Sequence, residues 1–187
     1  HPRSPKVPTV HLNVRYFELT DESGAVTDAW LGGGTDLTPY YPHEEDPAHF
    51  HRVLRDICDG FHAEFYGKYK PWCDEYFRNT HRGGEARGAG GIFYDHLRPE
   101  DVGLSWDQGF AFADAVGHSL EAAYAPIVAR RRDEAYGEAE RHFQLLRRGR
   151  YVEFNLVHDR GTTFGLQTNA RIESVLMSLP PLAAWDY

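Results

Sequence analysis

An alternating stretch near the start of the chain places the strongest constraint on its fold. Residues 7–19, V-P-T-V-H-L-N-V-R-Y-F-E-L, change between apolar and polar side chains with a period of two, which is typical of a half-buried β-strand. Neighbouring side chains of a strand point to opposite faces, so the apolar residues share one face. The other face then carries three polar side chains in a row: His11, Asn13 and Arg15.

Two interpretations of this polar face stay open from the residues alone. It can be the solvent-exposed side of an edge strand. A general acid, an amide and a guanidinium, spaced by about 7 Å along a strand, would also hold an acidic ligand and deliver a proton to it.

The segment after this strand indicates a hairpin that ends in glycines. Residues 21–24, D-E-S-G, form a turn signal, and residues 25–31 form a return strand that leads into the triplet Gly32-Gly33-Gly34. A glycine triplet commonly makes a tight turn and no more. It also lets the backbone approach a flat ligand closely and holds one carboxylate, that of Asp36, at a fixed point.

The rest of the chain alternates between helical and short extended patterns. We expect helices over residues 46–66, 70–81, 105–132 with a break near Pro126, 136–147 and 172–178, a glycine-rich loop over 81–91, and strands over 91–95, 150–157 and 162–168, the last two joined by a turn at 159–161. Asp46 and Ser105 are expected to cap the first and third helices. No internal repeat or linker interrupts the chain. Hairpins separated by helices indicate an α+β fold with a mostly antiparallel sheet.

Composition narrows the class of protein. The 187 residues carry a net charge of −8, which is a poor match for nucleic acid, and no apolar run approaches the roughly 20 residues that a membrane span needs. The two cysteines are too few for a disulfide scaffold and indicate a reducing compartment. Eighteen glycines, 11 histidines and 14% aromatic residues suit a site for a flat, partly apolar ligand with acid groups.

Two basic segments are further candidates. The first, R-R-G-R over residues 147–150, is by default the solvated end of an element. The second, T-N-A-R over residues 168–171, precedes an expected helix, where backbone N–H groups and Arg171 would together bind a carboxylate. The histidines, in contrast, show no H-x-x-x-H spacing, so the residue pattern alone gives little support for a metal.

Seven stretches of the chain form a recognisable series. They are V-P-T-V-H-L-N-V-R-Y-F-E, W-L-G-G-G-T-D-L-T-P-Y-Y, E-E-D-P-A-H-F-H-R, K-P-W-C-D-E-Y-F, H-R-G-G-E-A-R-G-A-G-G-I-F-Y-D, R-R-G-R-Y-V-E-F-N-L-V-H-D-R-G-T-T-F-G-L-Q-T and R-I-E-S-V-L-M-S-L-P-P. In this order, and over nearly the whole chain, they resemble the family of oxygen-dependent coproporphyrinogen III oxidases. The family's chains are longer at both ends. We therefore expect residues 1–187 to form a single domain, the core fragment of such a chain.

The resemblance implies a reaction and a set of site residues. The reaction is the aerobic oxidative decarboxylation of two propionate groups of coproporphyrinogen III to vinyl groups, which yields protoporphyrinogen IX, CO₂ and H₂O₂ in haem biosynthesis. O₂ is the co-substrate, and no organic cofactor takes part. The positions that match the family's catalytic residues are His11, the proton donor, and Asp36. The positions that match its substrate-binding triplets are Asn13, Val14 and Arg15, and Asn169, Ala170 and Arg171. The positions that match four metal-binding histidines of bacterial members are His1, His11, His51 and His81.

The same resemblance implies a large, mostly antiparallel sheet flanked by helices on both faces. It also implies a homodimer to which the C-terminal portion contributes, and a cytoplasmic location, or a mitochondrial one in a eukaryote. Two other functions stay open: a non-catalytic tetrapyrrole-binding or carrier domain, and a metal-dependent oxygenase built on the histidines.

Overall fold

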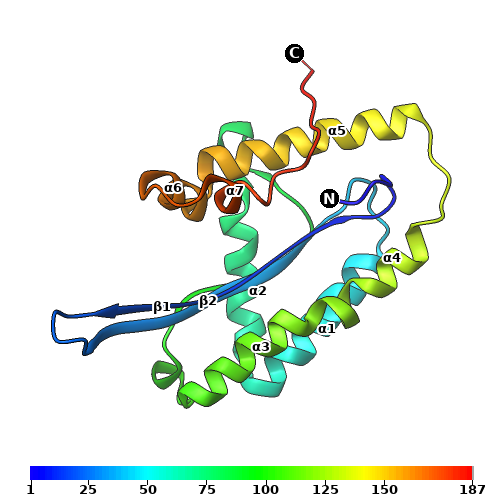
Figure 1. The fold of residues 1–187 in the computed structure, drawn as a ribbon. Coiled ribbons are helices and arrows are strands. Elements are labelled where there is room, and N and C mark those ends of the chain that lie inside the picture. Colours follow the sequence, from blue (N-terminus) through cyan, green and yellow to red (C-terminus); the bar gives the residue numbers. More distant parts are fainter. Residues whose placement is uncertain (187) are drawn as a thin grey trace.

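A computed structural model of the chain describes residues 1–186 and places an antiparallel sheet between two layers of helices (Figure 1). The strands β1 (Thr9–Thr20), β2 (Val26–Thr38) and β5 (Gly90–Leu97) pair in the order β1-β2-β5. The α+β class and the helices on both faces are confirmed. The sheet is smaller than expected, because only these three strands form it within the described residues; β3 (Arg78–Asn79) and β4 (Glu85–Ala86) make a separate ribbon.

The glycine triplet lies inside strand β2 and does not form a tight turn. The strand continues to Thr38, and the hairpin register places His11 opposite Asp36. Gly34 adopts a φ of +154°, and a Cβ atom there would lie 2.2 Å from the carbonyl oxygen of Ile92 on β5. The glycines therefore allow another group to come close to the backbone, as expected for a ligand-binding segment. The group that comes close in the structure is the neighbouring strand β5 and not a ligand.

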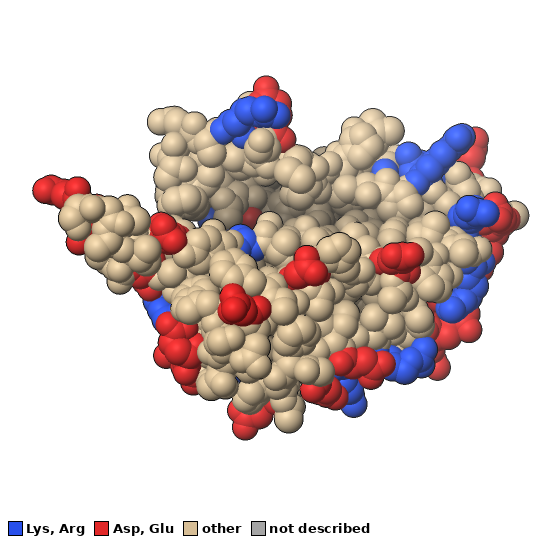
Figure 2. Space-filling view, turned by 60° about the horizontal axis from the view of Figure 1, so that its bottom comes forward, with Lys and Arg blue, Asp and Glu red and all other residues tan. Residues whose placement is uncertain are grey.

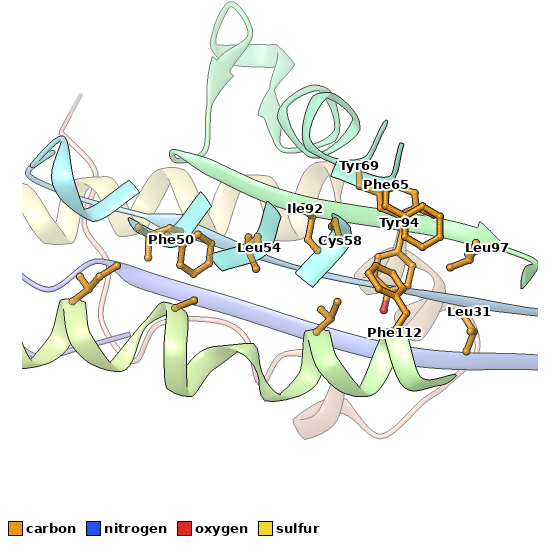
Figure 3. Packing of buried hydrophobic residues seen from close by; sticks show 14 residues of the cluster. Leu31, Phe50, Leu54, Cys58, Phe65, Tyr69, Ile92, Tyr94, Leu97 and Phe112 are labelled. Carbon is orange, nitrogen blue, oxygen red and sulfur yellow. The ribbon is translucent and has the colours of Figure 1, made fainter. Parts of the chain in front are cut away.

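The apolar face of the sheet packs on α1 (Glu45–Phe61), α2 (Phe65–Tyr76) and α3 (Trp106–Ala123). Figure 3 shows the rings of Phe65, Tyr94 and Phe112 gathered at one end of this core. The centroid of the Phe112 ring lies 4.9 Å from that of Phe65 and 5.1 Å from that of Tyr94. Since each fully buried side chain of this kind contributes about 1.5–3 kcal/mol, this row holds the helices against the sheet.

The helix boundaries differ from the expected ones at α1 and α2. The N-cap residue of α1 is Glu44, so Asp46 does not cap it. Asp46 is buried and pairs with Arg130 and Arg131 of α4 (Ala125–Arg131), at 2.6 and 2.8 Å. A carboxylate with two arginine partners is better satisfied there than at a cap. Helix α2 spans residues 65–76 instead of the expected 70–81.

The expected start and break of the third helix are confirmed. The Ser105 side chain accepts a hydrogen bond from the backbone N–H of Gln108, whose side chain accepts one from the backbone N–H of Ser105. This reciprocal capping box starts α3. The break near Pro126 separates α3 from α4.

The C-terminal third is helical, so the two strands expected there are wrong. It comprises α5 (Glu138–Glu153), a π-helical turn η3 (Phe154–His158), α6 (Arg160–Gln167) and α7 (Ile172–Val175). The buried positions of this part follow helical spacing and include the apolar residues Tyr151 and Val152. They also include three polar residues that are not typical of a core: Gln144, Arg148 and Asn155. The expected turn residue Asp159 instead caps α6, because its carboxylate accepts a hydrogen bond from the Thr162 backbone N–H at 2.7 Å.

These helices cover the polar face of the sheet, opposite α1 and α3 (Figure 1). Across residues 1–186, no helix combines the length and the apolar character that crossing a membrane requires.

Candidate active site

A cavity of about 490 Å³ separates the polar face of the sheet from η3 and α6. Figure 2 shows a hollow on this side of the molecule, with single charged side chains in its depth and uncharged residues along most of its rim. Its walls include several aromatic side chains. Its polar and charged residues come from segments far apart in the chain: His11, Asn13, Arg15, Asp36, Arg87, Asp95, His96, Asn155, Asp159, Arg160 and Ser178. An apolar cavity of this size with convergent polar groups is typical of a small-molecule site.

The inner end of the cavity is built around the carboxylate of Asp36. Only 2% of Asp36 is exposed. Its Oδ1 lies 3.1 Å from Nδ1 of His11, the residue opposite it in the hairpin, and its Oδ2 accepts a hydrogen bond from Nη2 of Arg87 at 2.5 Å. Both carboxylate oxygens are thus engaged, and the two predicted catalytic residues lie in contact.

Opposing effects act on the pKa of Asp36. Burial by itself raises it, but the charge of Arg87 and the hydrogen bond from His11 outweigh burial and hold the pKa below its usual range. Burial by itself lowers the pKa of Arg87, but the charge of Asp36 and the hydrogen bond to it, together with Tyr151, outweigh burial and raise this pKa. Asp36 is therefore a buried anion that forms an ion pair with the guanidinium of Arg87, which stays charged.

Arg87 is a residue of this cavity that the sequence analysis did not identify as a candidate. Its guanidinium carbon lies 3.9 Å from the ring centroid of Phe77, 4.5 Å from that of Tyr151 and 5.1 Å from that of Phe154. Its Nη1 donates to Oδ1 of Asn155 at 3.4 Å. Stacking on three rings is available to arginine because the guanidinium is planar and weakly hydrated. The only sequence feature that singles out Arg87 is its position as a charged residue within the glycine-rich segment 81–91.

Arg15 lies toward the outer end of the cavity. Its Nη1 donates to Oδ1 of Asn13 at 2.9 Å, and its Nη2 donates to Oδ1 of Asp95 on β5 at 3.1 Å. Val14 alternates to the opposite face of the sheet and lines a different groove. The structure therefore brings His11, Asn13 and Arg15 together along the polar face of β1. All three line the cavity, which favours the interpretation of this face as a ligand site.

The second predicted substrate-binding triplet lies outside this cavity. The side chain of Arg171 is 79% exposed, with its Nε 3.6 Å from Oε2 of Glu173. Asn169 has a φ of +54° and is exposed, as is Ala170. The role of these three residues in substrate binding stays a prediction from the resemblance.

The four histidines predicted as metal ligands have separate surroundings. His1 donates to the carbonyl oxygen of Ser178 at 2.8 Å, and His51 donates to that of Ala89 at 3.0 Å. His81 contacts His158 and Glu153, at 2.7 and 2.8 Å, whereas His11 contacts Asp36. Within residues 1–186 no group of three or more His, Cys, Asp or Glu side chains is arranged to hold a metal ion. In this arrangement the four histidines do not form a shared metal site. Metal binding by His1, His11, His51 and His81 therefore rests on the resemblance alone and stays a prediction.

The two cysteines are not candidates for chemistry. Cys58 and Cys73 are free and buried. Burial raises the pKa of the Cys58 thiol to about 12 and raises that of Cys73 as well. Since the thiolate is the reactive form, both act as core residues.

Glu153 gives the protein an acid-sensitive contact. Hydrogen bonds from Arg82, His81 and Trp185 lower its pKa from 4.5 to about 2, although burial acts in the opposite direction. A carboxyl whose pKa is depressed in the folded state adds stability that is complete above about pH 4.5 and is lost as the pH falls toward 2. We expect Glu153→Gln to flatten the pH dependence of unfolding in this window, as measured by urea denaturation. The exposed Glu121→Gln is the control and should follow the parent curve.

A comparison with known protein families identifies an enzyme family, which is consistent with a small-molecule cavity. The family model described as coproporphyrinogen III oxidase matches residues 1–187, the whole chain. The structure adds a cavity whose polar groups include His11 and Asp36, the two residues predicted to be catalytic, in direct contact. The chain therefore belongs to the coproporphyrinogen III oxidase family, and with it to the oxidoreductases of porphyrin biosynthesis.

Proposed function

We propose that this chain oxidises coproporphyrinogen III with O₂, without an organic cofactor, and converts two propionate groups to vinyl groups. For each propionate, the carbon attached to the pyrrole loses a hydrogen with its electron pair, and the carboxylate leaves the neighbouring carbon as CO₂, so that the electrons of the broken C–C bond form the double bond of the vinyl group. O₂ accepts the hydrogen with its electron pair and, with a proton, becomes H₂O₂. The observation that carries the proposal is the buried anion of Asp36, paired with Arg87 and His11 at the inner end of a large aromatic cavity.

The cavity suits a flexible tetrapyrrole with carboxylate side chains. Its walls include the rings of Tyr76, Phe77 and Phe93, and the rings of Tyr76 and Phe93 are stacked with centroids 4.4 Å apart. Such walls accept pyrrole faces and exclude water. The Arg15 guanidinium offers a planar fork that matches a propionate.

Asp36 is the residue best placed to act on the pyrrole ring. Its carboxylate accepts hydrogen bonds from pyrrole N–H groups and stabilises positive charge that develops on the ring as electrons leave. Because Arg87 and His11 already hold it in place, it needs no reorganisation when that charge appears. His11, in contact with Asp36, is the proton donor for reduced oxygen.

O₂ reacts directly with the electron-rich pyrrole in this proposal. The protein then supplies orientation and electrostatic stabilisation, and the redox equivalents come from the substrate and O₂. The electrons pass from the substrate to O₂ in this proposal, so none of its steps requires a metal.

We also propose that the chain forms a homodimer through its C-terminal portion. Six large apolar side chains on η3, α6, α7 and the adjoining segment are exposed: Leu156, Val157, Phe164, Leu166, Ile172 and Met177. An apolar surface of this kind is typical of an interface. Analytical ultracentrifugation checks this, and a monomer at all concentrations would contradict it.

The activity itself is tested with the purified chain after treatment with a chelator. The chain is incubated with coproporphyrinogen III in air, and protoporphyrin fluorescence is measured after oxidation. We expect product, because the proposed reaction needs no metal. Tight substrate binding without product, with or without added divalent metal, would favour the carrier function. Product only after metal is restored would favour the metal-dependent oxygenase.

A further inference from the structure

We propose that a second cavity, which adjoins the substrate cavity at His11, is the passage by which O₂ enters the site and H₂O₂ leaves it. This inference rests on the function proposed above. It deepens that function, because it gives the second substrate and its reduced product a route that the tetrapyrrole does not use.

The two cavities share a wall. The second cavity has a volume of about 500 Å³. Five residues line both it and the substrate cavity: His11, Asn13, Asp159, Gly161 and Ser178. These residues come from the first half of β1, the start of α6 and the segment after α7. A small molecule in the second cavity therefore reaches the inner end of the site from the side, beside His11.

The proposed reaction needs such a route. Each propionate consumes one O₂ and releases one H₂O₂, so oxygen has to arrive and peroxide has to leave while the tetrapyrrole is bound. The substrate cavity, of about 490 Å³, is in the size range that a single bound ligand fills. A tetrapyrrole in that cavity thus blocks its mouth to a second molecule.

The lining of the second cavity suits small neutral molecules. Within residues 1–186 no arginine or lysine lines it, whereas Arg15, Arg87 and Arg160 line the substrate cavity. The propionates of the substrate therefore favour the substrate cavity, because a carboxylate without a cationic partner is costly to take out of water. Apolar residues form part of the second lining: Val10, Leu12, Val175 and Met177. O₂ is neutral and apolar, so it enters this space without that cost.

Hydrogen bonds and close packing hold the walls of the passage. His1 donates to the carbonyl oxygen of Ser178 at 2.8 Å, and the amide of Asn155 donates to Oγ of Ser178 at 3.4 Å. Helices α6 and α7 lie side by side (Figure 1), and a Cβ atom on Gly165 would lie 2.7 Å from Cγ2 of Val175. The passage is therefore a fixed part of the fold.

His11 lies where the passage meets the reaction. Its Nδ1 is 3.1 Å from Oδ1 of Asp36, and the proposed function makes it the proton donor for reduced oxygen. O₂ that arrives through the second cavity is reduced next to this donor. The H₂O₂ that forms then leaves by the same cavity and does not pass the tetrapyrrole.

Ser174→Phe tests the passage by filling it. Ser174 lines the second cavity and not the substrate cavity, and it is exposed, so a larger side chain there costs the fold little. We expect the KM for O₂ to rise about tenfold, while kcat at saturating O₂ stays within about twofold of the parent value. The Kd of coproporphyrin III, the stable oxidised form of the substrate, should also stay unchanged in a fluorescence titration.

The matched control is Glu173→Phe. It makes the same change at the neighbouring position of α7, which is exposed and lines neither cavity. Its KM for O₂ should equal that of the parent chain. Both positions lie near the surface proposed for the homodimer, so sedimentation of the parent and of both variants is compared.

NMR relaxation locates O₂ in the parent chain without turnover. Dissolved O₂ is paramagnetic and speeds the relaxation of the methyl groups that it approaches. With coproporphyrin III bound, added O₂ should relax the methyl groups of Val175 several-fold faster than those of Val26. Val26 is a matched reference, because it is 55% exposed and lines neither cavity.

The outcomes separate the passage from the proposed function. A parent chain that neither binds coproporphyrin III nor oxidises the substrate contradicts the proposed function itself. In an active parent chain, a KM for O₂ that Ser174→Phe leaves within about twofold overturns the passage alone. A raised Kd of coproporphyrin III with an unchanged KM for O₂ assigns the second cavity to the tetrapyrrole and also overturns the passage. If Ser174→Phe changes sedimentation, the NMR measurement decides, and Val175 methyl groups that relax no faster than those of Val26 overturn it.

Discussion

Replacing Asp36 by Asn should lower kcat by about two to three orders of magnitude while changing KM little. The expected size is that of removing one preorganised group aimed at charge that develops in the transition state. Asn keeps the shape and one acceptor oxygen but not the negative charge, so the binding of the ground-state substrate is largely retained. The measurement is steady-state kinetics of protoporphyrinogen formation, corrected for the folded fraction.

The same substitution should also destabilise the fold, by about 3 kcal/mol, because it leaves the buried guanidinium of Arg87 without a counter-ion. A matched control separates the two effects. Asp46 is also a buried aspartate, held by Arg130 and Arg131 outside the cavity. Asp46→Asn should lose stability in urea, though less because Arg131 keeps Glu45 and Glu134 as partners, and should keep the kcat of the parent chain. A raised KM with unchanged kcat in Asp36→Asn would contradict the catalytic role of Asp36.

Gly91→Ala should destabilise the sheet by about 3 kcal/mol or prevent folding. A Cβ atom at Gly91 would lie 1.9 Å from the carbonyl oxygen of Thr35 on β2, and both groups are backbone-fixed. Relief requires β2 and β5 to separate, which costs ladder hydrogen bonds and moves Asp36, the residue opposite Gly91. Urea denaturation followed by circular dichroism measures the loss.

A glycine in a helix provides the opposite expectation. Gly117 lies within α3, and the nearest atom to a Cβ there is a Val14 methyl carbon at 3.9 Å, an ordinary contact. Gly117→Ala should therefore stabilise the chain by about 0.5–1 kcal/mol, since alanine loses less conformational freedom in a helix. Equal effects of the two substitutions would contradict the steric account of Gly91.

Local chemistry made several features predictable. The period-two pattern of residues 7–19 fixes which side chains of β1 share a face, and the structure places His11, Asn13 and Arg15 in one cavity. Ser105 and Pro126 act within a few residues of themselves, so the start and the break of the third helix were predictable. The helical pattern of residues 138–153 was harder to read, because its buried face includes Gln144 and Arg148.

The hairpin, the polar face of β1 and the family follow from the order of the residues alone. Which charged groups meet depends on how the elements pack. Asp36 and Arg87 are separated by 51 positions in the chain, and Arg15 and Asp95 by 80, so no local rule connects them. The physical reason is that a buried charge is stable only beside its partner, and a partner on another element is supplied by packing, not by neighbouring residues. The cavity and its two charged ends are therefore properties of the assembled sheet and helices.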